Sequence, residues 1–410
     1  MNTHSASKLF TPVTIGPLTL RNRTIRSAAF EGMCPGNAPS PMLLDYHRSV
    51  AAGGVGMTTI AYASVTRSGL SFPRQLWLRP EIIPGLREVT AAIHAEGAAA
   101  SIQIGHCGNM SHKSICGVTP ISASSGFNIY SPTWVRGMKR EELPEMAKAY
   151  GSAVCLAREA GFDAVEVHAG HGYLISQFLS PYTNHRKDEY GGSLENRMRF
   201  MTMVMNEVMK AAGKDLAVFV KMNMRDGFRG GMEIEETLEV ARRLESLGAH
   251  ALVLSGGFVS KAPMYVMRGA MPIKTLTHYM DCWWLKFGVK LAGRMMIPTV
   301  PFKEAYFLED ALKFRSEIKI PLIYVGGLVS REKIDEVLNE GFEAVQMARA
   351  LLNEPGFVNR MRREEKARCN CGHSNYCIGR MYTIEMACHH HLAEELPLCL
   401  QKEIEHLENK

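Results

Sequence analysis

The chain has 410 residues, of which 46% are hydrophobic and 21% are charged, so it is long enough to bury a large core. The formal net charge of +6 is small for this length, and no basic run is interleaved with aromatic residues, which argues against nucleic acid as a partner. Residues 1–8 lack the apolar core of a signal peptide, and no uncharged, continuously apolar stretch reaches the ~18 residues of a membrane helix, so we expect a cytoplasmic protein with no membrane partner.

Residues 12–23 alternate apolar and polar positions around Gly16 and Pro17, which predicts a hairpin. Strands and helices then alternate along the chain, which is typical of an α/β fold. The predicted strands cover residues 24–30, 55–60, 98–104, 164–167, 216–222, 251–254, 321–325 and 344–347. The predicted helices cover residues 43–52, 84–96, 143–160, 194–212, 234–247, 303–314 and 330–339. One parallel β/α (TIM) barrel of ~250 residues or more, with extensions, accounts for this length and pattern.

Two histidines and a tyrosine follow the predicted strand 164–167, at His168, His171 and Tyr173. The carboxyl end of a parallel strand is where β/α folds place their chemistry. A lone histidine at such a position is more often structural, so the evidence is the longer string that these residues begin. The string continues with Tyr190, Gly191, Gly192, Ser193, Asn196 and Arg197.

The complete string resembles the flavin-binding β/α barrels of the Old Yellow Enzyme family, and the resemblance runs from about residue 9 to residue 357, less residues 258–301. It implies an FMN-dependent NAD(P)H oxidoreductase that reduces the activated C=C bond of an α,β-unsaturated carbonyl, nitro or enoyl thioester compound. NADH or NADPH would act as a diffusing reductant. By this resemblance His168 and His171 hydrogen-bond the carbonyl or nitro oxygen of the substrate, and Tyr173 delivers a proton to carbon.

The resemblance also implies a set of FMN contacts at the strand ends. A glutamine can donate and accept at once, which suits a pyrimidine ring, and glycine N–H groups beyond the last two strands of such barrels commonly hold phosphate. A lysine in an apolar strand must meet an anion or snorkel to the strand end. The expected cofactor-binding residues are Ser27, Ala28, Ala29, Phe30, Tyr62, Gln103, Lys221, Gly326, Gly327, Ala348 and Arg349. The family commonly has proline and a bulky or polar residue where this chain has Ala28 to Phe30, so its flavin redox tuning is expected to differ.

Two long segments interrupt the alternation. Residues 109–140 form a connection rich in Ser, Gly and Pro, and a loop of this length is expected to help cover the site. Residues 258–301 form an apolar and aromatic insertion at the predicted catalytic face. This insertion either walls a substrate pocket or forms a subunit interface, so a homo-oligomer is among the expected assemblies.

Ten cysteines in so long a chain do not indicate a disulfide scaffold, and four of them crowd near the C-terminus, at Cys369, Cys371, Cys377 and Cys388. Longer relatives, of the dienoyl-CoA reductase and trimethylamine dehydrogenase branch, carry a four-cysteine iron–sulfur motif here. Cys371, Cys377 and Cys388 match three of its ligands, while Ser374 replaces the fourth, so we expect no intact cluster and no bound metal. Cys369, or a histidine among His389–His391, is the alternative fourth ligand for an iron–sulfur or zinc site. We therefore divide the chain into an FMN-binding barrel, residues 1–360, and a cysteine- and histidine-rich extension, residues 361–410.

Two other functions stay open at this stage. Some relatives demethylate small methylated amines oxidatively with the same barrel, and the aromatic insertion could build a cage for a cation. The chain could also be a non-catalytic flavin- or metal-binding protein, in which the cysteine extension does the work. Neutral histidine donors suit an oxyanion better than a cation, which favours the alkene reductase.

Overall fold

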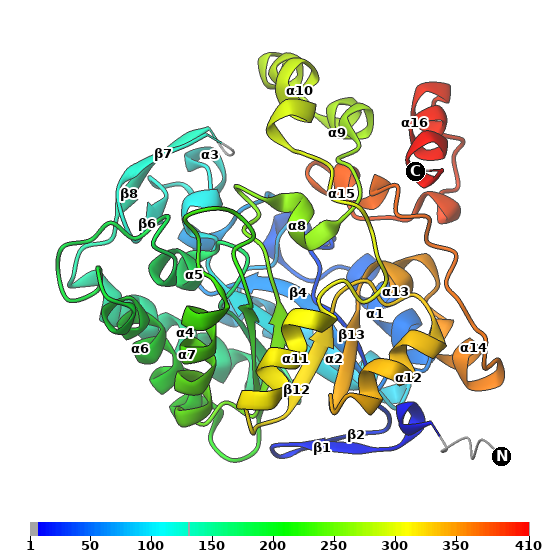
Figure 1. Ribbon diagram of the computed structural model, residues 1–410, viewed down its shortest axis with the longest axis horizontal. Helices are drawn as coiled ribbons and strands as arrows, with labels where there is room; N and C mark the ends of the chain where they lie inside the picture. Colours follow the sequence, from blue (N-terminus) through cyan, green and yellow to red (C-terminus); the bar gives the residue numbers. More distant parts are fainter. Residues whose placement is uncertain (1–6, 130–131, 410) are drawn as a thin grey trace.

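The computed structural model describes residues 7–129 and 132–409 (Figure 1). Eight parallel strands close into a barrel in the order β10-β11-β12-β13-β3-β4-β5-β9, which confirms the predicted α/β barrel. Their bounds are β3 (Thr24–Arg26), β4 (Met57–Ser64), β5 (Ala99–Gly105), β9 (Ala164–His168), β10 (Ala217–Asn223), β11 (Ala251–Ser255), β12 (Leu322–Val325) and β13 (Ala344–Met347). The predicted hairpin is also present, as β1 (Val13–Ile15) paired with β2 (Leu18–Leu20).

A ring of helices surrounds the barrel, and serine side chains begin three of them. Ser40, Ser193 and Ser330 each accept a hydrogen bond from the backbone N–H three residues on, which satisfies an otherwise unpaired donor of the first turn. The ring consists of α1 (Pro41–Ala52), α2 (Ile83–Ala95), α4 (Glu142–Glu159), α6 (Leu194–Ala212), α7 (Ile234–Ser246), α11 (Leu308–Glu317) and α12 (Arg331–Asn339). The helix predicted from residue 303 begins only at Leu308, because Ala305 has a φ of 53° and cannot continue a right-handed helix.

The barrel interior changes from apolar to polar along its axis. Val13, Ile15 and Leu20 of the hairpin pack against inward-facing strand residues such as Ala164 and Phe219, which closes the amino-terminal mouth. Because side chains alternate along a strand, the next inward position after Ala164 is Glu166. By the same alternation Lys221 follows Phe219 on β10. The apolar layer therefore supports a layer of polar side chains nearer the carboxyl ends of the strands.

Both long insertions contain regular secondary structure, so residues 109–140 are not the plain loop that we expected. Residues 109–140 contain α3 (Lys113–Cys116) and a small sheet in the order β6-β8-β7, made of β6 (Ile121–Ser122), β7 (Gly126–Asn128) and β8 (Thr133–Gly137). Residues 258–301 contain α8 (Pro263–Met267), α9 (Ile273–Tyr279) and α10 (Trp283–Met296). The first follows β5 and the second follows β11, so both rise from the carboxyl end of the barrel, above the strands in Figure 1.

The C-terminal residues pack back onto the barrel and onto the second insertion. Cys369 lies in the main hydrophobic core, and the N–H of Arg331 donates to the carbonyl of Ala367. Glu403 of α16 (Leu398–Glu408) accepts hydrogen bonds from the N–H groups of Lys274 and Thr275 at the start of α9. The remaining elements of this part are α13 (Arg349–Asn353), α14 (Phe357–Arg363), which spans the predicted boundary at residue 360, α15 (Tyr376–Met381) and the short 3₁₀ helix η6 (His389–His391). Among the described residues, no helix is both long and apolar enough to cross a membrane.

Candidate active site at the carboxyl end of the barrel

The polar layer inside the barrel is built around the carboxylate of Glu166. One of its oxygens lies 2.8 Å from Lys221 Nζ and accepts a hydrogen bond of 2.7 Å from Gln103 Nε2. The other accepts a bond of 2.7 Å from Gln346 Nε2. Lys221 Nζ also donates to Ser27 Oγ at 3.1 Å. The anion that Lys221 requires is therefore supplied by the protein itself.

A cavity of about 180 Å³ opens above this polar layer. Most of the predicted cofactor-binding residues lie in its wall, together with one histidine of the predicted catalytic set. These are Ser27, Ala28, Ala29, Lys221, Gly326, Gly327, Ala348, Arg349 and His171. The wall also contains residues that sequence reasoning did not select, among them Ser255, Tyr306, Gln346, His373 and Met386. The cavity therefore collects residues from the ends of β3, β10, β11, β12 and β13, from the segment after β9 and from the C-terminal extension.

The lining of this cavity fits the flavin cofactor that the resemblance implies. Gln346 Oε1 is buried with no hydrogen-bond partner among the described residues, so it is free to accept from a ligand N–H. Gly327 has a φ of 71°, and a Cβ there would lie 2.6 Å from the ring of Tyr306. Only glycine therefore fits, and its bare backbone can approach a phosphate closely. The guanidinium of Arg349, whose Nη1 donates to Asn375 Oδ1 at 2.6 Å, stands in the same wall and matches the charge of a phosphate.

Three of the predicted cofactor-binding residues do not line this cavity. The strand β3 ends at Arg26, whose guanidinium forms an ion pair of 2.6 Å with the buried carboxylate of Glu31. In the segment between these two residues, the ring of Phe30 stacks on that of Phe72, with ring centroids 4.7 Å apart. Tyr62 shares a hydrogen bond of 2.9 Å with Ser71. The Gln103 amide donates to Glu166 below the cavity floor. Phe30, Tyr62 and Gln103 are therefore absent from this cavity wall, and their part in FMN binding stays a prediction.

His168, His171 and Tyr173 form one group, here called the histidine-tyrosine cluster. The ring centroids of His168 and His171 are 5.0 Å apart, and those of His168 and Tyr173 are 4.5 Å apart. Tyr62 packs against it, with its ring centroid 5.0 Å from that of Tyr173. His171 joins the cluster to the cavity, because its side chain also lines the cavity wall.

The backbone and two polar neighbours hold His171 in place. Its φ of 58° lies in the left-handed region, which is uncommon for a residue other than glycine. Its N–H donates to Asn223 Oδ1 at 2.9 Å, and its Nε2 shares a hydrogen bond of 2.7 Å with Ser255 Oγ. Asn223 in turn donates to Asp226 at 2.9 Å. This strained but supported conformation is of the kind that clusters at functional sites.

The environment keeps every member of the cluster uncharged. Burial, followed by the charges that His171 and Lys221 would place nearby, lowers the pKa of His168 well below its ordinary value. Burial and Lys221 lower the pKa of His171 to about 3. Burial raises the pKa of Tyr173 above its ordinary value. His168 Nδ1 accepts a long hydrogen bond of 3.4 Å from the Gly170 N–H, so the ring proton lies on Nε2. The cluster therefore offers neutral N–H and O–H donors.

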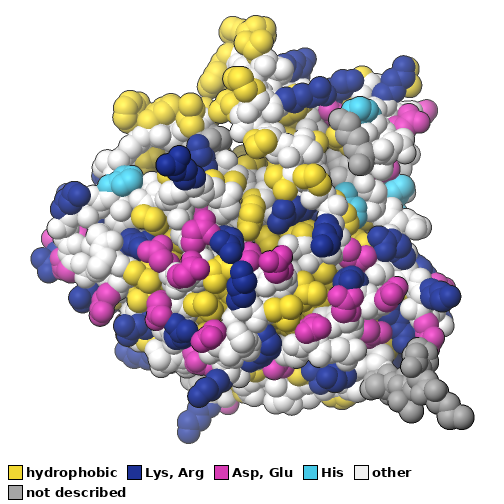
Figure 2. Space-filling model, in the orientation of Figure 1, with side chains coloured by type: hydrophobic (Ala, Val, Ile, Leu, Met, Phe, Trp, Pro, Cys, Tyr) yellow, Lys and Arg dark blue, Asp and Glu magenta, His cyan; other side chains and the backbone are white. Residues whose placement is uncertain are grey.

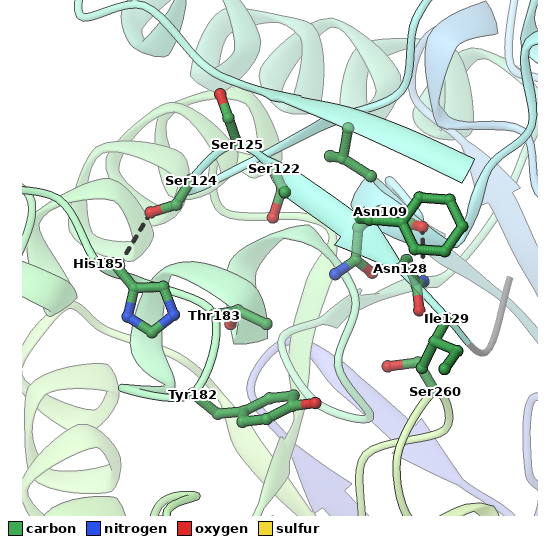
Figure 3. Close-up of a pocket in the computed structure, with 13 residues that line it drawn as sticks. Asn109, Ser122, Ser124, Ser125, Asn128, Ile129, Tyr182, Thr183, His185 and Ser260 are labelled. Carbon is green, nitrogen blue, oxygen red and sulfur yellow. Dashed lines mark hydrogen bonds between the residues drawn. The ribbon is translucent and has the colours of Figure 1, made fainter. Parts of the chain in front are cut away.

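A second pocket lies between the small sheet and the segment after α5 (Leu174–Leu179), and Figure 3 shows its labelled side chains converging from both sides. Ser124 Oγ accepts from the His185 N–H at 2.9 Å, and Asn128 Nδ2 donates to the Asn109 carbonyl at 2.9 Å. Phe127 and Ile129 form part of its wall. The segment 109–140 thus walls a pocket of its own on the catalytic face.

The C-terminal cysteines gather around a small cavity beside Arg349. Its wall contains Cys371, Cys377 and Cys388 together with Ser374, and burial raises the pKa of the Cys377 thiol to about 12. Cys369 is not part of this wall, and its thiol donates a hydrogen bond of 3.1 Å to Asn353 Oδ1. Among the described residues, the side chains that bring three ligand atoms within 4.8 Å of one another are His389, His390 and Glu408, not the cysteines. This arrangement does not form a compact cysteine site for one metal ion.

Four residues of the site, Glu166, Gln346, Tyr306 and His373, were not predicted from the sequence. For two of them the sequence does contain a pattern that indicates a polar site. Glu166 and Gln346 are polar residues inside short apolar strands, and that contrast marks them in the same way as it marked Lys221. Tyr306 and His373 reach the cavity from a loop and from the extension, and no local pattern distinguishes them.

Comparisons with known proteins agree with the geometry. Residues 8–292 match the family described as NADH:flavin oxidoreductase / NADH oxidase. A 4,4'-dithiodibutanoate disulfide reductase from Rhodococcus erythropolis is 38% identical over 384 residues, which cover 93% of this chain and 95% of that protein. An NADPH dehydrogenase from Halalkalibacterium halodurans is 30% identical over 356 residues, which cover 85% of this chain and 92% of that protein. The solved structure of an Old Yellow Enzyme homologue from Zymomonas mobilis has a TM-score of 0.72 at 22% identity, covering 92% of this chain and 97% of that one.

Proposed function

The chain belongs to the NADH:flavin oxidoreductase / NADH oxidase family, which includes the Old Yellow Enzyme barrels that it resembles, and on that premise we propose that it binds FMN and reduces an activated C=C bond. The observation that supports the proposal is the histidine-tyrosine cluster, whose uncharged rings pack together and join, through His171, the wall of a cavity that fits a flavin. The substrate class is an alkene conjugated to a carbonyl, nitro or thioester group.

The cavity residues would hold FMN without covalent attachment. The ammonium of Lys221 has three N–H donors, and Glu166 and Ser27 occupy two of them, so one remains for the ligand. Gln346 Oε1 would accept from the flavin ring, while Gly326, Gly327, Ala348 and Arg349 would hold the phosphate. When bound, FMN would supply the redox chemistry, taking a hydride from NAD(P)H and giving it to the substrate.

The two histidines would polarise the substrate. Negative charge develops on the carbonyl or nitro oxygen as the double bond is reduced, and donors that are already in place stabilise that charge. His168 Nε2 carries a proton and has no hydrogen-bond acceptor among the described residues, so it is available to the substrate oxygen. His171 is fixed by Ser255 and Asn223, which preserves the geometry that the donor pair requires.

Tyr173 would then provide the proton that completes the reduction. Its raised pKa keeps the phenol protonated at neutral pH, and its ring lies against His168, next to the donor that holds the substrate oxygen. A positioned acid of this kind typically contributes about 10²- to 10⁴-fold in rate. The oxidative demethylation of amines is less well supported, because an uncharged donor cluster offers no stabilisation to a cation.

A second candidate substrate is an organic disulfide. The observation that favours it is the disulfide reductase from Rhodococcus erythropolis, which is similar over 93% of this chain. Reduction of R–S–S–R to two thiols requires a hydride and one proton. NAD(P)H would supply the hydride and Tyr173 the proton, while the histidines would stabilise the departing thiolate. The same site could therefore serve either electrophile.

One stopped-flow experiment separates these functions. Purified protein would be photoreduced under argon and mixed with cyclohexenone, a nitroalkene, an enoyl thioester or 4,4'-dithiodibutanoate, while the return of oxidised flavin absorbance is followed. We expect fast reoxidation by at least one conjugated alkene. Reoxidation by the disulfide alone would select the second candidate, and reduction of the oxidised flavin by trimethylamine would select the demethylase. Purified protein without flavin would contradict all three.

A further inference from the structure

The helix α10 presents an unusual row of large apolar side chains to solvent. Trp283, Phe287, Leu291 and Met295 are 78%, 67%, 79% and 83% exposed, and they recur at every fourth position. Trp284 is exposed beside them. Residues four apart lie on one side of a helix, so the row is a continuous stripe over more than three turns. Exposed apolar stripes of this size mark interaction surfaces.

A parallel row of basic side chains lies beside the stripe. Lys286, Lys290 and Arg294 also recur at every fourth position, and each lies about 60° to 100° around the helix axis from the nearest members of the apolar row. Between Trp283 and Met296 the helix contains no acidic residue. Figure 2 shows hydrophobic side chains at the top of the molecule, over α10, with basic side chains next to them. An apolar face with tryptophans and a flanking basic row is the pattern of a helix that lies in a membrane interface.

A second apolar tip stands on the same face of the molecule. Trp134 and Phe127, on the adjacent strands β8 and β7, are 73% and 53% exposed, and their rings are in contact with centroids 5.3 Å apart. Ile129 is exposed next to them. This tip follows β5 and the stripe follows β11, so both project from the carboxyl end of the barrel. In Figure 2 the two apolar groups stand at the upper left and the top of the molecule.

We propose that the carboxyl-end face docks on an anionic lipid surface through the α10 stripe and the Phe127–Trp134 tip. The α10 stripe and the Phe127–Trp134 tip are separate apolar projections, and a lipid surface is one that both can enter at once. The basic row of α10 matches the negative charge of the lipid headgroups. A second copy of this chain fits less well. In a two-fold pairing of α10 the row Lys286, Lys290 and Arg294 would approach the same row of the partner, with no acidic residue in the helix to balance it.

The proposal revises the expectation that the protein has no membrane partner, which considered only spanning segments. A helix that lies in the interface needs neither the length nor the uniform hydrophobicity of a spanning helix. Docking would also bring the pocket of Figure 3 to the lipid surface, because Phe127 and Ile129 belong both to its wall and to the apolar tip. It is independent of the chemistry proposed for the barrel.

Tryptophan fluorescence of the flavin-loaded protein tests the docking directly. The chain has four tryptophans, and three of them, Trp134, Trp283 and Trp284, are exposed on the tip and on α10. In a Trp77→Phe variant, all tryptophan emission therefore comes from the proposed lipid contact. We expect vesicles of phosphatidylcholine with about a third phosphatidylglycerol to shift the emission to the blue and to co-sediment the protein. Vesicles of phosphatidylcholine alone should bind at least about tenfold more weakly, and added salt should release the protein.

Matched variants locate the contact. Trp283→Ser with Phe287→Ser and Leu291→Ser should lower vesicle binding at least about tenfold, and Lys286→Gln with Lys290→Gln and Arg294→Gln should remove the preference for anionic lipid. The control changes the same number of exposed basic residues at the opposite end of the barrel, by Lys210→Gln, Lys214→Gln and Lys319→Gln, and should leave binding unchanged. The proposal is overturned by equal loss in the control, by the absence of vesicle binding, or by a dimer in sedimentation velocity that the Trp283, Phe287 and Leu291 changes dissociate.

Discussion

Glu166 on β9 and Lys221 on β10 form an ion pair of 2.8 Å inside the barrel, and almost no part of either side chain reaches solvent. Gln103 and Gln346 complete the hydrogen bonding of the carboxylate, so the pair is neutral as a whole and well supported. Lys221 nevertheless lines the floor of the cavity. The pair therefore serves the stability of the barrel and, through the remaining ammonium donor, the affinity for a ligand.

Replacing Lys221 by Met should destabilise the flavin-free protein by about 3–5 kcal/mol, because Glu166 would be left as an uncompensated buried charge. The measurement is urea-induced unfolding followed by circular dichroism. Lys313→Met is the matched control, since the half-exposed Lys313 forms a surface ion pair in which its Nζ lies 3.8 Å from Asp310 Oδ1. A pair of that kind contributes about 0–1 kcal/mol. Equal effects of the two changes would show that Glu166 is not charged in the folded protein.

The contribution of Lys221 to FMN binding can be measured without this loss of stability. Glu166→Gln combined with Lys221→Met removes both charges, so the barrel should remain folded. We expect the affinity of this double variant for FMN to fall by about 1.5–3 kcal/mol, the scale of a hydrogen bond from a charged donor. Flavin fluorescence quenching on titration of the flavin-free protein gives the dissociation constant, and the Glu166→Gln single change is the reference. An unchanged constant would remove Lys221 from the cofactor site.

Much of the fold could be predicted because local signals agree with the tertiary structure. The helix Leu194–Ala212 has the predicted bounds, since Ser193 caps its first turn and Gly213, with a φ of 64°, ends it. The insertion 258–301 was not predicted as helical. The repeat of large apolar residues at every fourth position, Trp283, Phe287, Leu291 and Met295, nevertheless indicates a helix. The basic positions Lys286, Lys290 and Arg294 form only a narrow row, and the other positions of this helix are apolar or small, which weakens its helical period.

The candidate site could be predicted where it depends on strand order alone. Gly326, Gly327, Ala348 and Arg349 end two neighbouring strands, and neighbouring strand ends must meet at one edge. Directions of side chains could not be predicted in the same way. Phe30 and Tyr62 do not line the cavity, because Phe72 and Ser71, in the segment after β4, provide their partners, and no local pattern at Phe30 indicates that distant contact.

Replacing Tyr173 by Phe should separate the two half-reactions. Reduction of the flavin by NADPH should be nearly unchanged, while reoxidation by an enone should slow by about a hundredfold or more, because the proton donor is lost. Stopped-flow absorbance resolves the two steps. Tyr182→Phe is a suitable control, since Tyr182 is an exposed tyrosine of the second pocket. If both half-reactions of Tyr173→Phe slow together, Tyr173 only positions its neighbours.

The lowered pKa of His168 and of His171 predicts a loss of stability on mild acidification. Both rings stay neutral in the folded chain, and unfolding allows them to take up protons below their ordinary pKa of about 6.5. The unfolded state therefore binds more protons, so stability falls as the pH drops from about 6.5 toward the folded pKa of His171, by about 1.4 kcal/mol per pH unit for each histidine.

Unfolding curves at about pH 7 and about pH 5 measure this dependence. His171→Asn should reduce the slope by about 1.4 kcal/mol per pH unit, the share of one proton. Ser255→Ala removes the partner of His171 without removing the titrating ring, so it should lower stability by about 1 kcal/mol and leave the slope as it is. A slope that His171→Asn does not change would mean that His171 is already protonated in the folded state.

The cysteine extension should contain little iron. Iron–sulfur clusters are held by thiolates, but Ser374 stands among Cys371, Cys377 and Cys388, and burial raises the pKa of Cys371 and, to about 12, of Cys377, which favours uncharged thiols. Protein made and kept without oxygen should therefore carry flavin but substoichiometric iron and acid-labile sulfide.

Two variants decide what the extension can hold. Ser374→Cys restores a fourth thiol to the same cavity and should raise the iron and sulfide content measured by colorimetric assay. Cys369→Ala should leave the iron content unchanged, because Cys369 does not line that cavity and its thiol donates a hydrogen bond to Asn353 Oδ1 in the cavity wall. Fully loaded iron in the unmodified protein that Cys369→Ala abolishes would contradict this account, since it would require Cys369 to leave the core and replace Ser374. If the extension holds no cluster to carry electrons, the flavin is expected to receive its hydride directly from NAD(P)H, so NAD(P)H alone should bleach the flavin of the iron-free protein under argon.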